Sequence, residues 1–213
     1  MILEVNNLEV CYGLKKAVKR VSFAMGPGES VGLLGANGAG KSSTLKAILG
    51  MIRPSKGEIR TLNKRPGSFA SFEKLGFAPE EGSPPDYLTG KEYLDFVSAL
   101  KMPMRQKGFL EVDELLGWFE LEPKKPIRDY SKGMKRRLIL AQAFLGNPEL
   151  IILDEPLNGL DPLMIIKLRT KLNEQKEKGT SILYSSHILS EVEKCCSRAL
   201  ILKEGELVLD ASL

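Results

Sequence analysis

The sequence predicts an α/β fold in which a mostly parallel sheet is flanked by helices. Two strand-like runs of the buried type, at residues 150–153 and 180–185, alternate with helical segments in the last third of the chain. Continuous apolar strands are typical of parallel sheets covered on both faces, and strand–helix alternation builds such sheets. The first third is rich in strands and the middle is helical, which adds an N-terminal antiparallel β subdomain and an inserted helical subdomain.

The first third carries alternating apolar and polar residues between turn signals, as strands do. Gly26-Pro27-Gly28 marks a turn, and a helix ends where Gly50 and Pro54 follow it. The expected elements are strands at 2–10, 18–25, 30–34 and 57–62, and a helix at 42–49.

The middle of the chain changes to helical periodicity. Thr89 and Glu92 have the spacing of a capping box, and the next apolar residues, Tyr93, Phe96, Val97 and Leu100, share one helical face. A second helix is expected over 112–119, and Ser131 caps a third that runs to about 145. Residues 80–147 are therefore interpreted as the helical subdomain.

The last third returns to alternating strands and helices. Asp161 and Pro162 begin a helix as N-cap and first-turn residues. A short helix follows at 189–196, and residues 199–209 form a hairpin around Glu204-Gly205. We expect one domain over 1–213, in which 1–79 and 148–213 make up the core with its β subdomain.

Composition narrows the class of protein. Hydrophobic residues make up 43% of the chain, and the net charge is +4 without a dense basic tract; we therefore expect no nucleic-acid partner. The three cysteines fit neither a disulfide framework nor a zinc site. There is no apolar run of membrane-spanning length and no signal-peptide pattern, so a cytoplasmic protein is expected.

Residues 35–42 read Gly-Ala-Asn-Gly-Ala-Gly-Lys-Ser, which fits the phosphate-loop pattern G-x-x-x-x-G-K-[ST] between a strand and a helix. Glycines let backbone amides face a polyanion, and the helix N-terminus adds positive charge. Lys41 reaches the β- and γ-phosphates of ATP, and the Ser42 hydroxyl is a ligand for Mg²⁺. The residues expected to contact ATP are Gly35, Asn37, Gly38, Ala39, Gly40, Lys41, Ser42 and Ser43.

Two acidic residues follow the apolar strand at 150–153. Asp154 emerges at its carboxyl end, where α/β sheets bind ligands, and is the expected metal carboxylate of a RecA-like P-loop NTPase. Glu155 is suited to orient or deprotonate water. His187, the single histidine, follows the strand at 180–185, where a neutral imidazole hydrogen-bonds the γ-phosphate or the attacking water. The catalytic set is Glu155, His187 and Lys41.

In this order the motifs resemble the nucleotide-binding domain of ATP-binding cassette (ABC) transporters over essentially the whole chain. The resemblance also rests on Tyr12, on Tyr130-Ser131-Lys132-Gly133-Met134-Lys135 and on Asn158-Gly159-Leu160-Asp161-Pro162. It implies that Tyr12 stacks on adenine. It implies that Ser131 and Gly133 close over the nucleotide of a second ATPase subunit, and that Asp161 links the two sites. It implies a membrane permease that holds the protein at the cytoplasmic face.

The sequence departs from the family pattern in two places. Tyr130, Lys132 and Met134 replace residues of the usual Leu-Ser-Gly-Gly-Gln signature, and Lys135 follows it. Glu80 stands where the family has a glutamine that reaches Mg²⁺. A carboxylate also ligates Mg²⁺, so Glu80 joins Ser42 and Asp154 as an expected metal ligand. Two alternatives to a transporter subunit stay open: a soluble ATPase of the same superfamily, and a non-catalytic nucleotide sensor.

Overall fold

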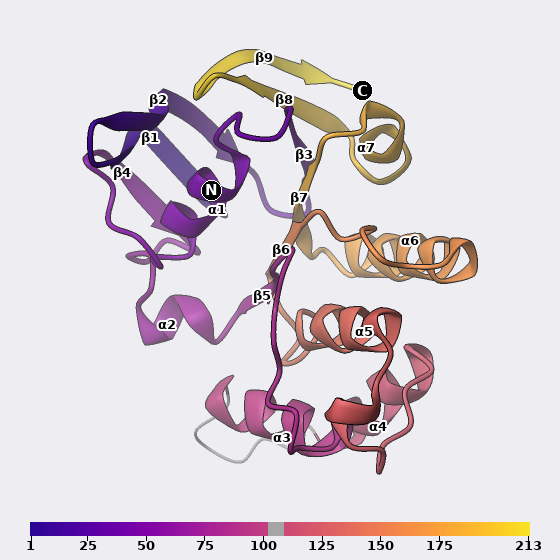
Figure 1. The fold of residues 1–213 in the computed structure, drawn as a ribbon. Helices are drawn as coiled ribbons and strands as arrows, with labels where there is room; N and C mark the ends of the chain where they lie inside the picture. The colour runs from indigo at the N-terminus through magenta and orange to yellow at the C-terminus, as the bar shows by residue number, and fades with distance from the viewer. Residues whose placement is uncertain (102–108) are drawn as a thin grey trace.

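The computed structural model describes residues 1–101 and 109–213 and contains two sheets in that part of the chain (Figure 1). The antiparallel sheet has the order β2-β1-β4. Its strands are β1 (Leu3–Tyr12), β2 (Lys15–Met25) and β4 (Lys56–Thr61). The larger sheet has the order β5-β6-β7-β3-β8-β9. Its strands are β3 (Ser30–Leu34), β5 (Leu75–Ala78), β6 (Leu150–Asp154), β7 (Ser181–Ser186), β8 (Arg198–Lys203) and β9 (Glu206–Ser212).

The larger sheet is parallel from β5 to β8, and β9 runs antiparallel to β8. Every residue of β6 and of β7 is buried, as the apolar runs predict. The β8–β9 turn has positive φ at Glu204 (51°) and Gly205 (84°), the pair of values that a tight hairpin turn requires. The predicted fold class is confirmed, with its β subdomain.

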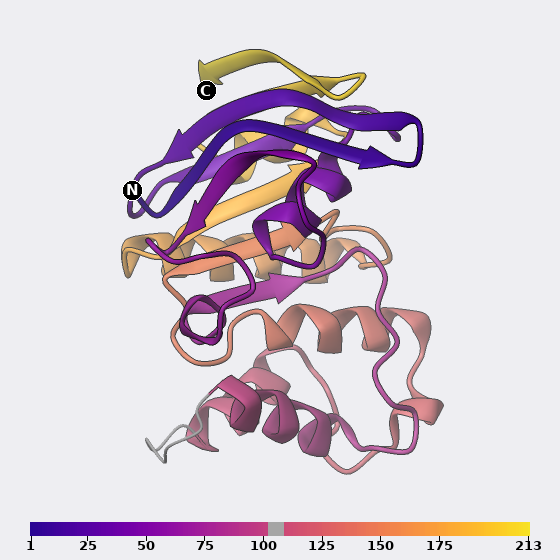
Figure 2. The same cartoon turned by 90° about the vertical axis from the view of Figure 1, so that its left-hand side faces the viewer.

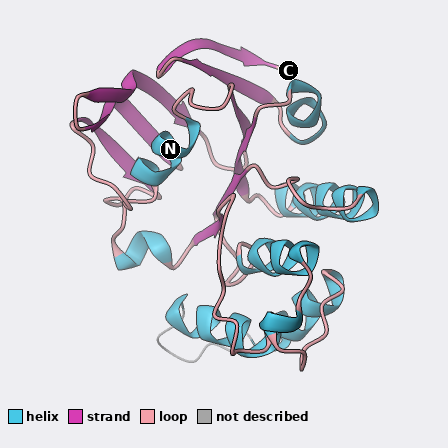
Figure 3. Ribbon diagram, viewed as in Figure 1, coloured by secondary structure: helices cyan, strands magenta, loops and turns pink. Residues whose placement is uncertain are grey.

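Helices cover both faces of the larger sheet (Figures 1, 2 and 3). Helix α1 lies on the side of the antiparallel sheet, α5, α6 and α7 lie on the other side, and α3 and α4 lie beyond α5. None of the helices in the described ranges is both long and apolar enough to cross a bilayer. The helices are α1 (Lys41–Ile48), α2 (Phe69–Phe72), α3 (Gly90–Lys101), α4 (Phe109–Trp118), α5 (Lys132–Gln142), α6 (Pro162–Glu177) and α7 (Leu189–Cys195), with a 3₁₀ turn at Ile127–Asp129.

The predicted helix starts are confirmed by their caps. The Ser131 hydroxyl accepts from the Met134 amide at 3.1 Å, and Asp161 Oδ1 accepts from the Met164 amide at 2.9 Å. Glu92 accepts from the Thr89 amide at 2.7 Å, and the Glu92 amide donates to the Thr89 hydroxyl at 3.2 Å. Each cap satisfies a backbone donor that a helix end leaves free.

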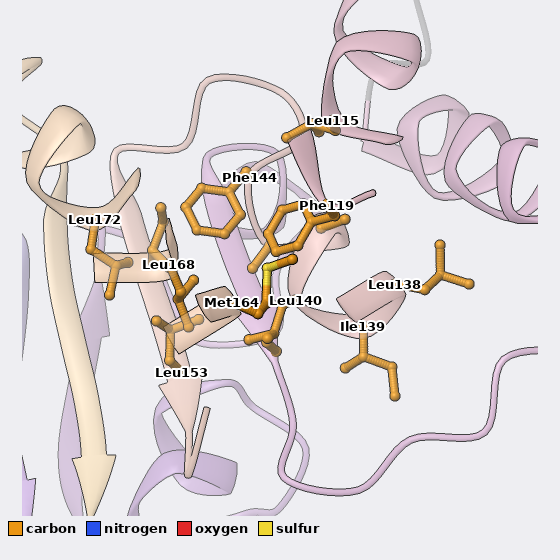
Figure 4. Close-up of a cluster of buried hydrophobic side chains, with 14 of the residues drawn as sticks. Leu115, Phe119, Leu138, Ile139, Leu140, Phe144, Leu153, Met164, Leu168 and Leu172 are labelled. Atoms are coloured by element: carbon orange, nitrogen blue, oxygen red, sulfur yellow. The ribbon is translucent and has the colours of Figure 1, made fainter. Parts of the chain in front are cut away.

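Two hydrophobic clusters lie on the two faces of the sheet. One cluster packs the antiparallel sheet and α1 against the larger sheet, and the other packs α5 and α6 against its opposite face. In the second, Phe119 and Phe144 pack with ring centroids 5.8 Å apart, close to Leu168 (Figure 4). The helical segment is therefore packed on the parallel sheet through α5. The division into a core and a subdomain at 80–147 stays a prediction.

Two elements were not predicted, and the ends of several others differ from expectation; β2, for example, begins at Lys15 rather than 18. Strand β5 and helix α2 were not predicted, because each has only four residues and shows no readable period. Helix α5 ends at Gln142 rather than near 145. Strand β1 continues to Tyr12, so Tyr12 is the last residue of the strand and not part of the following loop.

Candidate nucleotide-binding site

The predicted catalytic, metal-binding and phosphate-loop residues lie at the ends of four adjacent strands of the parallel sheet. The order β5-β6-β7-β3 brings the carboxyl ends of these strands to one edge. Glu80 follows β5, Asp154 ends β6, His187 follows β7, and the glycine loop follows β3. Parallel strands present their ligand sites at this edge. The topology therefore gathers residues that are up to 150 positions apart in the sequence onto one surface.

The loop between β3 and α1 is shaped by glycines. Gly38 has φ +82° and Gly40 φ +104°, values that side chains with a Cβ rarely adopt. A Cβ on Gly35 would lie 2.5 Å from the Leu202 carbonyl oxygen, and one on Gly40 would lie 2.6 Å from that of Ala17. Neighbouring backbone thus holds the loop from both sides, which explains the glycines at 35, 38 and 40.

The loop presents free backbone donors. In the part of the chain that the structure describes, the amides of Gly38, Gly40, Lys41 and Ser42 donate to no protein acceptor. The last of these belong to the first turn of α1, where amides lack an intrahelical partner and where the helix dipole favours negative charge. This arrangement is an anion cradle at the start of a helix.

The Lys41 side chain is only 6% exposed and turns back into the loop. Its ammonium donates to the Gly35 carbonyl oxygen at 2.6 Å and lies 3.2 Å from Glu155 Oε1. A positive charge beside the cradle stabilises a bound anion. Lys41 therefore lies between the cradle and Glu155.

Glu155 has an unusual backbone conformation and a buried side chain. Its backbone has a left-handed φ of 43°, an unfavourable conformation that functional sites often contain. Its amide is fixed by the Ser185 hydroxyl at 3.1 Å. Oε2 lies 2.9 Å from His187 Nδ1, whereas buried Oε1 has the Lys41 ammonium at 3.2 Å but accepts no hydrogen bond among the described residues. The carboxylate thus retains an acceptor that a water or metal ion would satisfy.

The oxygen donors suit Mg²⁺ chemically. Asp154 is 7% exposed, and its Oδ1 accepts a short hydrogen bond from the Ser185 hydroxyl. Glu80 is exposed, and its Oε1 accepts a hydrogen bond from the side-chain amide nitrogen of Asn158 at 3.3 Å. The described residues contain no cluster of three acidic, His or Cys ligands. Mg²⁺ is commonly held by one or two carboxylates with phosphate oxygens and waters, so Ser42, Asp154 and Glu80 fit it only together with a phosphate ligand.

A cavity of about 430 Å³ lies over this loop, within the size range of small-molecule sites. Tyr12 lines it with 49% of its surface exposed, so an aromatic face is free to stack. Lys15, paired with Tyr12 across the β1–β2 hairpin, also lines it and was not predicted. The full lining is Tyr12, Lys15, Ala17, Ala36, Asn37, Gly38, Gly40, Lys41, Ser42, Ser43, Glu80 and Glu155.

Arg136, from α5, was also missed. Its guanidinium donates to the backbone carbonyl oxygens of Pro79 and Glu80 after β5, and to those of Asp154 (3.1 Å) and Glu155 (2.8 Å) after β6. Burial lowers the pKa of the guanidinium, partly offset by nearby carboxylates such as Glu80. One side chain therefore joins the two strand ends that carry the acidic residues. No local pattern marks it, because its partners lie up to 57 positions away.

Ser131 and Gly133 lie elsewhere. Neither lines the cavity that contains Lys41 in the described structure. They stand at the start of α5, where a Cβ on Gly133 would approach the Gly159 carbonyl oxygen at 3.6 Å. Asp161, two residues after Gly159, caps α6. The hydrogen bond from the Met164 amide keeps the pKa of the Asp161 carboxyl low. Four other predicted residues are also absent from the lining but adjoin or contact residues that line the cavity: Gly35, Ala39, Asp154 and His187. Ser131, Gly133 and Asp161 instead stand at the starts of α5 and α6.

A parallel sheet, a glycine loop leading into a helix, and an acidic pair at the next strand end define a P-loop nucleotide-binding protein. The comparisons with known proteins give the family. The sequence profile described as ABC transporter matches residues 18–158. A solved structure, the ATP-binding subunit of an ABC transporter, has a TM-score of 0.93 and 35% identity, covering 100% of this chain and 90% of its own. The chain belongs to the ABC transporter ATP-binding family.

Two further similarities concern the length of the chain relative to its relatives and its fold. An ABC transporter ATP-binding protein of Synechocystis sp. is 41% identical over 202 residues, which is 93% of this chain but 57% of that protein. The chain thus spans little more than half the length of this relative. A cassette solved as a dimer in a post-hydrolysis state, with ADP and Pi bound, has a TM-score of 0.91 at 24% identity and covers 99% of this chain and 98% of its own. That likeness shows the fold.

Proposed function

We propose that this chain binds ATP with Mg²⁺ and hydrolyses it as the ATPase subunit of an ABC transporter. The backbone amides of Gly38, Gly40, Lys41 and Ser42 bind the phosphates, and the Lys41 ammonium neutralises the β- and γ-phosphates. Tyr12 stacks on the adenine ring, and Lys15 adds a positive charge beside it. The remaining loop residues Gly35, Asn37, Ala39 and Ser43 complete the contact with the triphosphate.

Ser42, Asp154 and Glu80 would hold Mg²⁺ together with phosphate oxygens. When bound, the metal ion neutralises charge that develops on the transferring phosphoryl group. The Ser185 hydroxyl keeps the Asp154 carboxylate turned toward this edge of the sheet. Glu80 supplies a carboxylate where the family has an amide, so it adds charge as well as an oxygen donor.

Glu155 orients the attacking water and accepts its proton. Its Oε2 is held by His187, which leaves Oε1 as the acceptor for the water. Oε1 carries this assignment: it lies 3.2 Å from the Lys41 ammonium but accepts no hydrogen bond in the described structure, and a buried carboxylate oxygen normally has a donor. His187 fixes the carboxylate and hydrogen-bonds the γ-phosphate side of the site. Lys41 stabilises the charge on the phosphate as the bond to the leaving group breaks.

The active unit is a dimer with a second ATPase subunit. Ser131 offers a hydroxyl and Gly133 a backbone amide in the first turn of α5, but both lie outside the cavity of their own chain. They would close over the nucleotide of the partner subunit, with Asp161 linking the sites. A separate permease would hold the dimer at the cytoplasmic face of the membrane and be driven by it. We propose no nucleic-acid partner.

Substitution of Glu155 tests the catalytic part of the proposal. In Glu155→Gln, we expect ATP turnover to fall by at least about 100-fold, while equilibrium ATP binding persists. Glu177→Gln, at the exposed end of α6, is the matched control and keeps its activity. Unchanged turnover in Glu155→Gln would overturn the role of Glu155. A wild-type chain that binds ATP without turnover under any condition would favour the nucleotide sensor, and co-purification with membranes separates a transporter subunit from a soluble ATPase.

A further inference from the structure

A second cavity, separate from the nucleotide site, lies at the far end of α1. It has a volume of about 720 Å³, compared with 430 Å³ for the cavity over the phosphate loop, and the two share no lining residue. Its walls come from the turn after α1, from β4, and from the segment after β4 (Figure 1). They are Ala47, Gly50, residues 52–60, and residues 63–66.

The lining of this cavity is strongly basic. Five of the lining residues are cationic and only one, Glu58, is acidic. The thirteen residues from 53 to 65 therefore carry a net charge of +4, the same as the whole chain. None of the five has an ion-pair partner within 4 Å in the described residues. The five cations are Arg53, Lys56, Arg60, Lys64 and Arg65.

Acidic residues on the neighbouring strand compensate this charge only in part. The β1–β4 register sets Lys56 opposite Glu9 and Arg60 opposite Glu4. Glu9 is already engaged by Lys16 and Arg20 at 3.6 and 3.4 Å. Cations held close together without anions repel one another. A bound anion would relieve this repulsion.

Close backbone contacts between glycines and other residues hold the walls of the cavity. A Cβ on Gly50 would lie 2.4 Å from the Gly67 backbone nitrogen, and one on Gly57 would lie 2.4 Å from the Asn7 carbonyl oxygen. Both glycines have positive φ. The turn after α1 is thus packed backbone to backbone on the segment before α2, and strand β4 is packed in the same way on strand β1. The cavity is preformed, which lowers the cost of ordering a ligand.

The lining also has an apolar part, beside the polar Ser55 and Asn63. Ala47 and Ile59 are buried beneath it, and Ile52 and Pro66 are partly buried. Guanidinium groups match phosphate oxygens in pairs, which makes arginine a preferred phosphate ligand. A basic rim over an apolar floor therefore suits a phosphorylated molecule that also has a carbon skeleton.

We propose that this cavity binds a ligand with at least two phosphate negative charges, distinct from the ATP that is hydrolysed. Two sources share this chemistry, a soluble bisphosphate and the phosphorylated headgroups of an anionic lipid surface. Three arginines bind the phosphates, and Lys56 and Lys64 add charge. The apolar floor receives the backbone of the sugar or of the glycerol.

The experiment uses the whole chain with saturating ADP and Mg²⁺, so that the phosphate loop is occupied. One arm measures binding of fructose bisphosphate by calorimetry. The other measures sedimentation with phosphatidylcholine vesicles, with and without phosphatidylglycerol. We expect wild type to bind at least one probe, and Arg53→Gln/Arg65→Gln to bind it at least about tenfold more weakly.

A charge-matched control separates the cavity from general electrostatics. Lys124→Gln/Lys125→Gln removes the same charge from a loop of the helical region and should bind as wild type does. Glu155→Gln should also bind normally, so that failure of the catalytic proposal and failure of this one are distinguishable. Binding of vesicles only identifies the lipid source, and binding of the sugar only identifies the soluble one. Binding of neither probe, or equal loss in both charge variants, overturns the proposal.

Discussion

The ammonium nitrogen of Lys41 lies 3.2 Å from Glu155 Oε1, and the two side chains are only 6% and 7% exposed. The residue expected to bind phosphate therefore contacts the residue expected to activate water. The desolvation of each charge is expensive unless the other is present. In the protein without nucleotide, this ion pair therefore contributes to stability through the same two residues that the proposed reaction needs.

This coupling predicts non-additive effects on stability. Without nucleotide, Lys41→Met leaves Glu155 buried without its cation, and we expect the free energy of unfolding to fall by about 3 kcal/mol. Adding Glu155→Gln removes the unpaired charge, so the double variant should be more stable than Lys41→Met alone. Urea denaturation of the four proteins measures this cycle. Strictly additive changes would show that the two charges do not interact.

Substitutions at the proposed adenine end of the site should weaken ATP binding without slowing the hydrolysis step. Tyr12 and Lys15 line the cavity from the β1–β2 hairpin, whereas Glu155 lines it from the end of β6. We expect Tyr12→Ala to raise the KM for ATP about tenfold with kcat nearly unchanged, and Lys15→Gln to raise KM by less. Tyr12→Phe keeps the aromatic face and should behave as wild type. A fall in kcat alone would place Tyr12 in the chemistry instead.

Arg136 predicts a large structural effect. Its guanidinium binds four backbone carbonyl oxygens at the ends of β5 and β6, and Arg136→Met leaves them without this donor. Because buried acceptors are costly when unsatisfied, we expect a loss of about 3 kcal/mol in unfolding free energy. Arg128→Met, in the 3₁₀ turn at Ile127–Asp129, is the control. If thermal unfolding of the two variants is the same, the network has no role in stability.

The loop, the acidic pair and His187 were predictable because local sequence determines each position. A glycine loop between strand and helix, and polar residues directly after a buried strand, need only the next few residues to be recognised. Adjacency of β3, β6 and β7 then brings them together.

Other features depend on contacts far along the chain. Arg136 acts on carbonyl groups 18 to 57 residues away, and Lys15 reaches the site only because β2 folds back on β1. The five cations of the basic cavity are spread over 53–65 in no run longer than two, and only the fold shows that they line one cavity. Strand β5 is too short to show a period, and its glycine weakens the strand signal.

Two glycines outside the site predict opposite responses to alanine. A Cβ on Gly76 in β5 would lie 1.9 Å from the Ala143 carbonyl oxygen, whereas one on Gly117 in α4 would meet nothing within 4 Å. We expect Gly76→Ala to lower the free energy of unfolding by about 3 kcal/mol. Gly117→Ala should raise it by up to about 1 kcal/mol, because alanine favours the helix. The melting temperatures of both variants test this contrast, and a stabilised Gly76→Ala would contradict the packing of β5 on α5.

Lys101 predicts a dependence of stability on pH. Its ammonium is buried at the end of α3 and donates to the Leu145 carbonyl oxygen at 3.0 Å. Burial lowers its pKa from 10.5 to about 8, partly offset by Glu111. Between these two values the unfolded chain binds a proton that the folded chain does not, so this group's contribution to stability rises with pH across the window. Below it, the buried charge costs about 3 kcal/mol.

Lys101→Met removes that cost together with one hydrogen bond worth about 1 kcal/mol. Near neutral pH we therefore expect the variant to be more stable than wild type. The advantage should shrink steadily as the pH rises from about 8 to 10.5 and then reverse. Taking the difference between the two proteins cancels other groups that titrate in this range, including Tyr93, whose pKa burial raises. Urea denaturation at a series of pH values measures it, with Lys124→Met as an exposed control. A difference that stays constant with pH would mean that the Lys101 ammonium is not desolvated, since only a shifted pKa produces the slope.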